Sequence, residues 1–124
     1  GCAAALANIE NYQNHGLIQQ IKVSTQYIAS RLPEFSKSPI VADIRHKGLL
    51  AGIELAKNNK PIVILKNKEI INYFIMQQAL KMGVYLRPLG NTMLLIPPLG
   101  IGKRDLEKLL NVHLLLLRKI QKLS

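Results

Sequence analysis

The sequence predicts a two-layer α+β domain, in which helices cover a small, mainly antiparallel sheet. Two observations support this fold class. Four segments have the residue pattern of helices, and two others, 40–55 and 84–96, read as pairs of strands joined by a turn. Because these hairpins alternate with helices along the chain, we expect one face of the sheet to be covered by helices.

The first two predicted helices open the chain. Residues 2–15 are rich in alanine, and Gly16 is expected to end this helix because glycine tolerates the left-handed conformation. The second helix is expected to end at Pro33 and the polar residues that follow it. Its apolar residues recur at helical spacing and are Leu17, Ile21, Ile28 and Leu32.

The segment 40–55 predicts a hairpin that turns at Gly48. Its first strand alternates Ile40, Ala42 and Ile44 with polar or smaller residues. The apolar face of its second strand consists of Leu49, Ala51, Ile53 and Leu55. Gly52 is expected to mark a bulge or a close approach of another backbone.

A third helix is predicted from Asn67, its N-cap, to Met82, with Gly83 closing it. Its inner face is expected to hold Ile70, Ile71, Phe74, Ile75 and Gln78.

A second hairpin is predicted next, with strands near 84–87 and 92–96 about the turn 88–91, and Pro97-Pro98 ends it. The last helix begins near Lys103, with acidic residues early and basic residues late, as the helix dipole favours.

Composition limits the class of protein. A chain of 124 residues fits one domain, and no apolar run is long enough to span a bilayer. The formal net charge is +10, but the basic residues are scattered and aromatic residues are few, so we expect a solvated basic surface and no nucleic-acid partner. Cys2 is the only cysteine, which agrees with a reducing cytoplasm.

The usual catalytic motifs are missing, including the P-loop, GxSxG and HExxH. His15, His46 and His113 lie in different predicted elements without metal-ligand spacing, so each is interpreted as structural or solvated. Asp43 and Glu54 can face one another across the first hairpin near Arg45, which indicates an ordinary cross-strand charge cluster.

Arg87 differs from the other charged residues. It closes a predicted strand directly before Pro88 and Gly90, which restrict the backbone. A guanidinium offers a planar fork that binds a carboxylate with two hydrogen bonds. From the residues alone, Arg87 is either a solvated hairpin arginine or an anion site.

Two strings resemble one family. "VADIRHKGLLAGIEL", from Val41 to Leu55, and "GVYLRPLGNTMLLIPPLGI", from Gly83 to Ile101, are similar to the C-terminal part of the class III aminotransferases, which are pyridoxal-phosphate enzymes of fold type I. "GCAAALANIE" resembles the helix that follows the phosphate-binding segment of that family. The helical surroundings fit the family over the whole chain.

The resemblance implies a domain organisation. Residues 1–124 would form the small C-terminal domain, with 1–32 a helical lead-in from a large domain and 40–124 the sheet-and-helix core. The Schiff-base lysine and the phosphate-binding residues would then precede Gly1. We therefore expect no catalytic or cofactor-binding residue in this chain, and no activity from it alone.

The Arg-Pro-Leu-Gly and Ile-Pro-Pro-Leu strings most resemble the branch of the family that acts in biotin biosynthesis. The resemblance implies transfer of an amino group from S-adenosylmethionine to 8-amino-7-oxononanoate by a cytoplasmic homodimer that binds pyridoxal phosphate. Arg87 matches the arginine that binds the substrate carboxylate, whereas Leu94 stands where some members have a tyrosine.

Two alternatives stay open. The enzyme could instead use ornithine, acetylornithine, 4-aminobutyrate or another ω-amine, although those relatives commonly have a different string at Arg87. The other alternative is a non-catalytic module that binds nucleic acid or small anions through its charge. Its binding would weaken steeply as salt is added.

Overall fold

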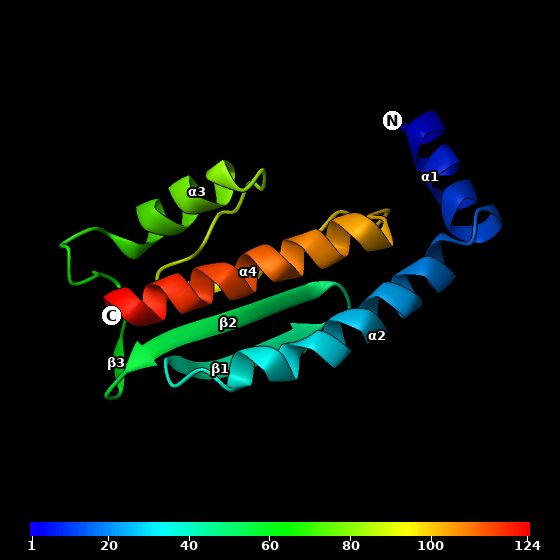
Figure 1. Ribbon diagram of the computed structural model, residues 1–124. Helices are drawn as coiled ribbons and strands as arrows, with labels where there is room; N and C mark the ends of the chain where they lie inside the picture. Colours follow the sequence, from blue (N-terminus) through cyan, green and yellow to red (C-terminus); the bar gives the residue numbers. More distant parts are fainter.

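The computed structural model describes all 124 residues and has the predicted α+β architecture (Figure 1). Helices α2 and α4 run along the sheet, α3 lies beside α4, and α1 projects away from the rest. The elements are α1 Cys2–Asn14, α2 Leu17–Ser36, β1 Val41–Lys47, β2 Leu50–Lys57, β3 Lys60–Pro61, α3 Ile71–Lys81, β4 Thr92–Leu95 and α4 Lys103–Leu123. No helix combines the length and the apolar character needed to cross a membrane.

Strand β2 is the centre of the sheet. It pairs antiparallel with β1, with the short β3 and with β4. Gly48 forms the predicted turn between β1 and β2, with a φ of +59° that glycine adopts without steric cost. Gly52 of β2 lies opposite Leu94 of β4, so the β4 edge of the sheet is set against the first half of β2.

The core lies between the sheet and the helices. The predicted apolar face of the second strand is confirmed, because Leu49, Ala51, Ile53 and Leu55 are all buried. From the helical layer, α4 contributes Leu106, Leu110, Val112, Leu116, Leu117 and Ile120. Helix α1 buries no residue, which agrees with its position outside the two layers.

The second helix ends among the predicted polar residues but not at Pro33, and the predicted start of the third helix was wrong. Helix α2 continues through Pro33 to Ser36, since a proline in the last turn removes only one backbone donor and the helix goes on to bury Phe35. Helix α3 starts at Ile71 with Ile70 as its N-cap. Asn67 does not cap it: its Oδ1 accepts a hydrogen bond from Glu69 N at 3.2 Å in a local turn.

The inner face of α3 was predicted in large part. Ile71, Phe74 and Ile75 are buried as expected, but Ile70 is exposed because it precedes the helix.

The second hairpin was also only half correct. Residues 92–95 form β4, but 84–87 form no strand, and only an isolated bridge joins Leu89 to Thr92. Strand β4 pairs with β2 instead.

The bulge expected at Gly52 is absent there; the irregularity lies in β1 between Val41 and Asp43. It breaks the alternation predicted for β1 and leaves Ala42 exposed. A Cβ at Gly52 would meet side-chain atoms of Thr92, at 3.4 Å, and Leu94, at 3.9 Å, and no backbone within 4 Å.

Candidate functional site

The turn that follows Arg87 is fixed by hydrogen bonds. Leu89 and Thr92 exchange backbone hydrogen bonds of 3.0 and 2.9 Å, and Gly90 has a φ of +56°. Asn91 attaches this turn to the central strand in two ways: its carbonyl accepts from Leu55 N, and its Nδ2 donates to Leu55 O, both at 2.8 Å. The backbone beside Arg87 is therefore held by β2 rather than left as a free loop.

Arg87 itself is an exposed side chain on an ordered segment. Its neighbour Leu86 is buried in the core, and Pro88 is half-buried. The guanidinium makes no hydrogen bond and no ion pair with another side chain of the chain, in contrast to Arg31 and Arg45. Its donors are free for an external acceptor.

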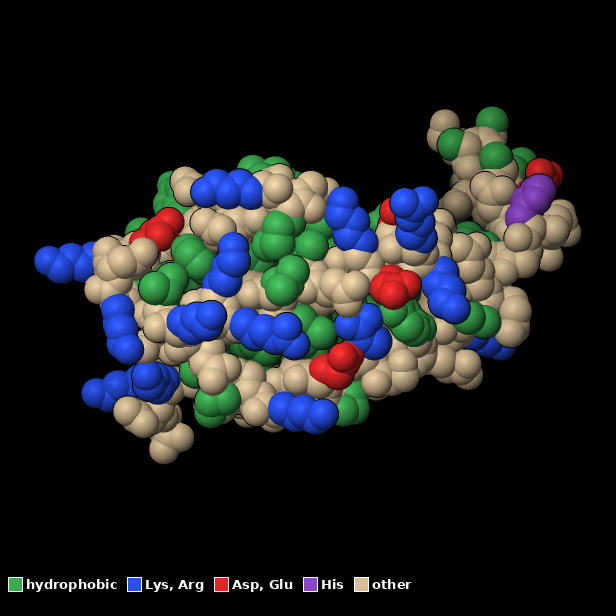
Figure 2. All heavy atoms as spheres, in the orientation of Figure 1, with side chains coloured by type: hydrophobic (Ala, Val, Ile, Leu, Met, Phe, Trp, Pro, Cys, Tyr) green, Lys and Arg blue, Asp and Glu red, His purple; other side chains and the backbone are tan.

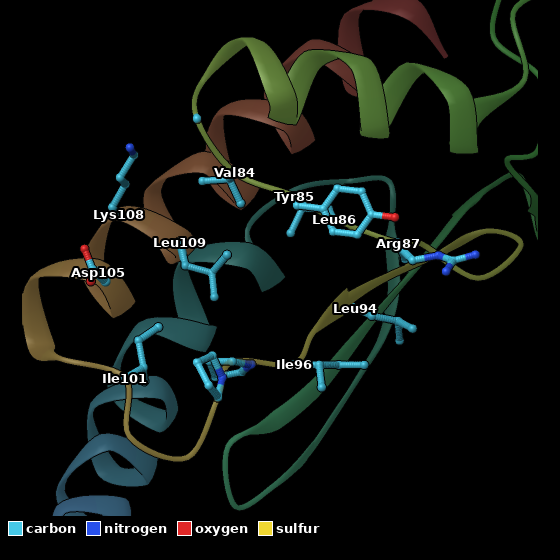
Figure 3. Close-up of a pocket in the computed structure, with 13 residues that line it drawn as sticks. Val84, Tyr85, Leu86, Arg87, Leu94, Ile96, Ile101, Asp105, Lys108 and Leu109 are labelled. Carbon is cyan, nitrogen blue, oxygen red and sulfur yellow. The ribbon is translucent and has the colours of Figure 1, made fainter.

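A cavity of about 440 Å³ adjoins Arg87. One wall is the segment 83–87, a second is the end of β4 with the residues after it, and the third is the first half of α4 (Figure 3). The apolar part of the lining includes Val84, Leu86, Leu94, Ile96, Ile101 and Leu109.

The polar groups of the cavity stand at different ends. Figure 3 shows Arg87 at one end and Asp105 with Lys108 at the other. Lys108 lies close to the turn after α3, since a Cβ at Gly83 would come within 3.0 Å of its Nζ. A positive fork followed by an apolar surface suits a ligand with a carboxylate head and an alkyl chain.

The sequence did not predict that α4 forms a wall of the cavity. Asp105, Lys108 and Leu109 have the spacing of one helix face, which is the signal that groups them, and Ile101 lies just before the helix. Nothing in the sequence, however, sets that face opposite Arg87.

A second cavity, of about 320 Å³, lies beyond Leu94 and Ile96 and is bordered by Arg45 and His46.

The other charged candidates are accounted for by local contacts. Arg45 lies 3.5 Å from the Asp43 carboxylate and 3.4 Å from that of Glu54, which confirms the cross-strand charge cluster. These groups are exposed, so the cluster adds little stability. No three His, Cys, Asp or Glu side chains gather as a metal site would require.

The histidines lie apart from one another. His15 is exposed, and a ring nitrogen of His46 lies 2.7 Å from Gly48 O at the β1–β2 turn. His113 is 1% exposed and contacts two backbone carbonyls. Burial lowers the pKa of His113, because the charged ring would lose its hydration, while the carbonyl contacts oppose part of that shift.

No lysine of this chain is enclosed in the way that a Schiff-base lysine is. A Schiff-base lysine is held in an enclosed pocket that lowers its pKa, whereas all twelve lysines of this chain are exposed, including Lys108 at the cavity.

The basic side chains spread over the surface around α4 with a few acidic ones between them (Figure 2). This distribution agrees with the scatter seen in the sequence.

Comparison with known proteins gives consistent matches. The family model for Aminotransferase class-III matches residues 1–114. Adenosylmethionine-8-amino-7-oxononanoate aminotransferase of Nitratidesulfovibrio vulgaris is 33% identical over 110 residues, which cover 89% of this chain and 20% of the relative. Putrescine–pyruvate aminotransferase of Pseudomonas aeruginosa is 29% identical over 111 residues, which cover 89% and 24%.

Solved structures match equally well. Adenosylmethionine-8-amino-7-oxononanoate aminotransferase from Methanocaldococcus jannaschii superimposes with a TM-score of 0.83 at 27% identity, over 96% of this chain and 27% of that one. The chain thus spans about a fifth to a quarter of the length of the relatives that it matches.

Proposed function

The chain belongs to the class III aminotransferases, and from this premise we propose that it is the part of such an enzyme that binds the carboxylate of the amino acceptor. The acceptor proposed is 8-amino-7-oxononanoate, and the donor is S-adenosylmethionine. The observation that carries this proposal is Arg87, an unpaired guanidinium at the rim of an apolar cavity.

The chemistry of Arg87 suits that acceptor. A carboxylate accepts two parallel, charge-assisted hydrogen bonds from a guanidinium, which fixes both the position and the direction of the acid. The rest of the acceptor is mostly alkyl chain, and the cavity offers it Leu94, Ile96 and Leu109. Anchoring the remote end of a substrate helps to orient its reacting end.

The cofactor is proposed to be pyridoxal phosphate, which carries the amino group between the two substrates when bound. Because no lysine here is enclosed, we place the Schiff-base lysine and the phosphate-binding groups outside residues 1–124. We further propose that the chain is the small domain of a cytoplasmic homodimer, with 1–32 leading in from the large domain and 40–124 forming the core. The chain alone should be inactive.

A second candidate keeps the family and changes the substrates. Relatives whose names specify putrescine and gamma aminobutyrate also match this chain, at 29% and 27% identity. 4-Aminobutyrate and pyruvate also carry a carboxylate, so in such an enzyme Arg87 would hold one of these small substrates and not a long keto acid. The role of Arg87 therefore discriminates between the two candidates.

The test uses the complete gene product that contains this chain. Arg87→Ala should raise the KM for 8-amino-7-oxononanoate at least tenfold, because two charge-assisted hydrogen bonds are lost. The KM for the amino donor should change much less. Arg104→Ala removes the same charge from an exposed position outside the cavity and serves as the control. Equal effects of Arg87→Ala on acceptor and donor would refute the proposed role.

A further inference from the structure

His113 joins two walls of the cavity. Its buried ring lies on the inner side of α4. Nδ1 is 2.8 Å from the carbonyl oxygen of Leu109, and Nε2 is 3.0 Å from the carbonyl oxygen of Leu94. Leu109 belongs to the helical wall and Leu94 to the strand wall. The side chain of His113 therefore contacts both walls of the cavity.

The carbonyl of Leu94 has no partner within the sheet. Leu55 N donates to Asn91 O at 2.8 Å, which makes these residues a hydrogen-bonded pair. Hydrogen-bonded and non-hydrogen-bonded pairs alternate along an antiparallel ladder, so the next bonds fall at Met93 and Leu95 and the backbone of Leu94 faces outward. Because β4 pairs only with β2, the ring of His113 takes the place of a further strand.

The two carbonyls differ in what else they accept. Leu109 O accepts the backbone N–H of His113, four residues later in the helix. Leu94 O faces outward and has no other donor. A neutral imidazole donates from one nitrogen only. A proton on Nε2 therefore satisfies the carbonyl that would otherwise be left unpaired.

We propose that His113 is a positioning residue, which holds β4 against α4 by a hydrogen bond from Nε2 to Leu94 O and so fixes the width of the cavity beside Arg87. The contact that His113 makes between the two walls is inferred from the distances alone. The inference that this contact affects binding of the acceptor depends on the proposed function.

The first test concerns the wall contact in the 124-residue chain. His113→Phe keeps a ring and removes both nitrogens, and His113→Gln keeps a side-chain donor. Hydrogen exchange at the Met93 and Leu95 amides should become roughly tenfold faster in the Phe variant, relative to exchange in α4, because β4 loses its outer anchor. His113→Gln should restore most of the protection. Nitrogen NMR of the wild-type ring should show the Nε2–H tautomer.

Two results would overturn the positioning role. One is equal acceleration of exchange in β4 and α4, since that is general destabilisation without a local effect. The other is the Nδ1–H tautomer at neutral pH, since Nε2 could then not donate to Leu94 O.

The second test concerns the cavity in the complete gene product. His113→Phe should raise the KM for 8-amino-7-oxononanoate several-fold while the KM for the amino donor stays the same, and His113→Gln should recover most of it. If exchange shows the wall contact but the acceptor KM does not move, the assigned effect on the cavity is wrong. If Arg87→Ala spares acceptor use while the exchange result stands, the proposed function fails and the wall contact survives.

Discussion

Arg87 is held in place by its neighbours, whereas its own side chain has no partner. Leu86 anchors the segment in the core, and the turn at Gly90 and Asn91 is bonded to β2. A guanidinium at such a position can offer two parallel hydrogen bonds to a carboxylate, which a lysine cannot do because its ammonium is a point charge.

We therefore expect Arg87→Lys to keep the positive charge but to bind the carboxylate of the acceptor more weakly. In steady-state kinetics on the complete gene product, the KM for the acceptor should rise roughly tenfold, as expected for the loss of one charge-assisted hydrogen bond. A variant as active as the wild type would mean that net charge, and not the fork, matters at this position.

His113 makes stability depend on pH. Its pKa in the folded chain is lowered by burial, while in the unfolded chain it should lie near the ordinary value of about 6.5. Below that pH the unfolded chain takes up a proton that the folded chain does not, so acid favours unfolding. The free energy of unfolding should fall by at most about 1.4 kcal/mol per pH unit between about pH 6.5 and the folded-state pKa.

Urea unfolding at a series of pH values measures this slope. Wild type and His113→Phe should differ most in slope between about pH 6.5 and the lowered folded-state pKa, and they should be parallel at pH 8. A His113→Phe slope identical to that of the wild type would show that other groups cause the acid sensitivity.

At the scale of elements, the turn 88–91 connects the site to the sheet. Asn91→Ala removes the 2.8 Å hydrogen bond to Leu55 O and leaves the carbonyl partner of Leu55 N in place. We expect a loss of about 1 kcal/mol in the free energy of unfolding and a raised acceptor KM, since Arg87 would be less well oriented. Asn14→Ala, at an exposed position without a side-chain hydrogen bond, is the control.

Thermal or urea unfolding of both variants, with kinetics on the complete gene product, tests this connection. An Asn91→Ala variant that is destabilised but has an unchanged acceptor KM would show that Arg87 does not depend on the turn.

The elements that could be predicted from sequence are those determined by local signals. Gly48, Gly83 and Gly90 all have positive φ at predicted turns or helix ends. In the middle of β2, every second residue is buried, as the predicted alternation of apolar residues requires. Residues 84–87 were misassigned because an apolar run does not say whether a neighbouring strand is available. Pro33 was misread because burial of Phe35 outweighs one lost donor in a last helical turn.

The candidate site could be predicted only in part for the same reason. Arg87 stands out in the sequence because Pro88 and Gly90 restrict its backbone. The opposite wall, with Asp105 and Lys108, and the link through His113 depend on how α4 packs against β4, which is a tertiary contact without a local signal.

At the scale of the whole molecule, the chain has its own core but covers only part of the relatives it matches. We expect the 124-residue chain mixed with pyridoxal phosphate, S-adenosylmethionine and 8-amino-7-oxononanoate to give no 7,8-diaminononanoate. Chromatographic detection of that product measures this. Turnover by the chain alone would mean that one of its exposed lysines serves the cofactor.

The proposed substrates are tested with the complete gene product loaded with pyridoxal phosphate. The absorbance of the cofactor is followed as S-adenosylmethionine, ornithine or 4-aminobutyrate is added, and again when 8-amino-7-oxononanoate follows. We predict that S-adenosylmethionine changes the spectrum and that 8-amino-7-oxononanoate reverses the change in the wild type but far less readily in Arg87→Ala. A spectral change with ornithine or 4-aminobutyrate alone, and none with S-adenosylmethionine, would contradict the proposed substrates.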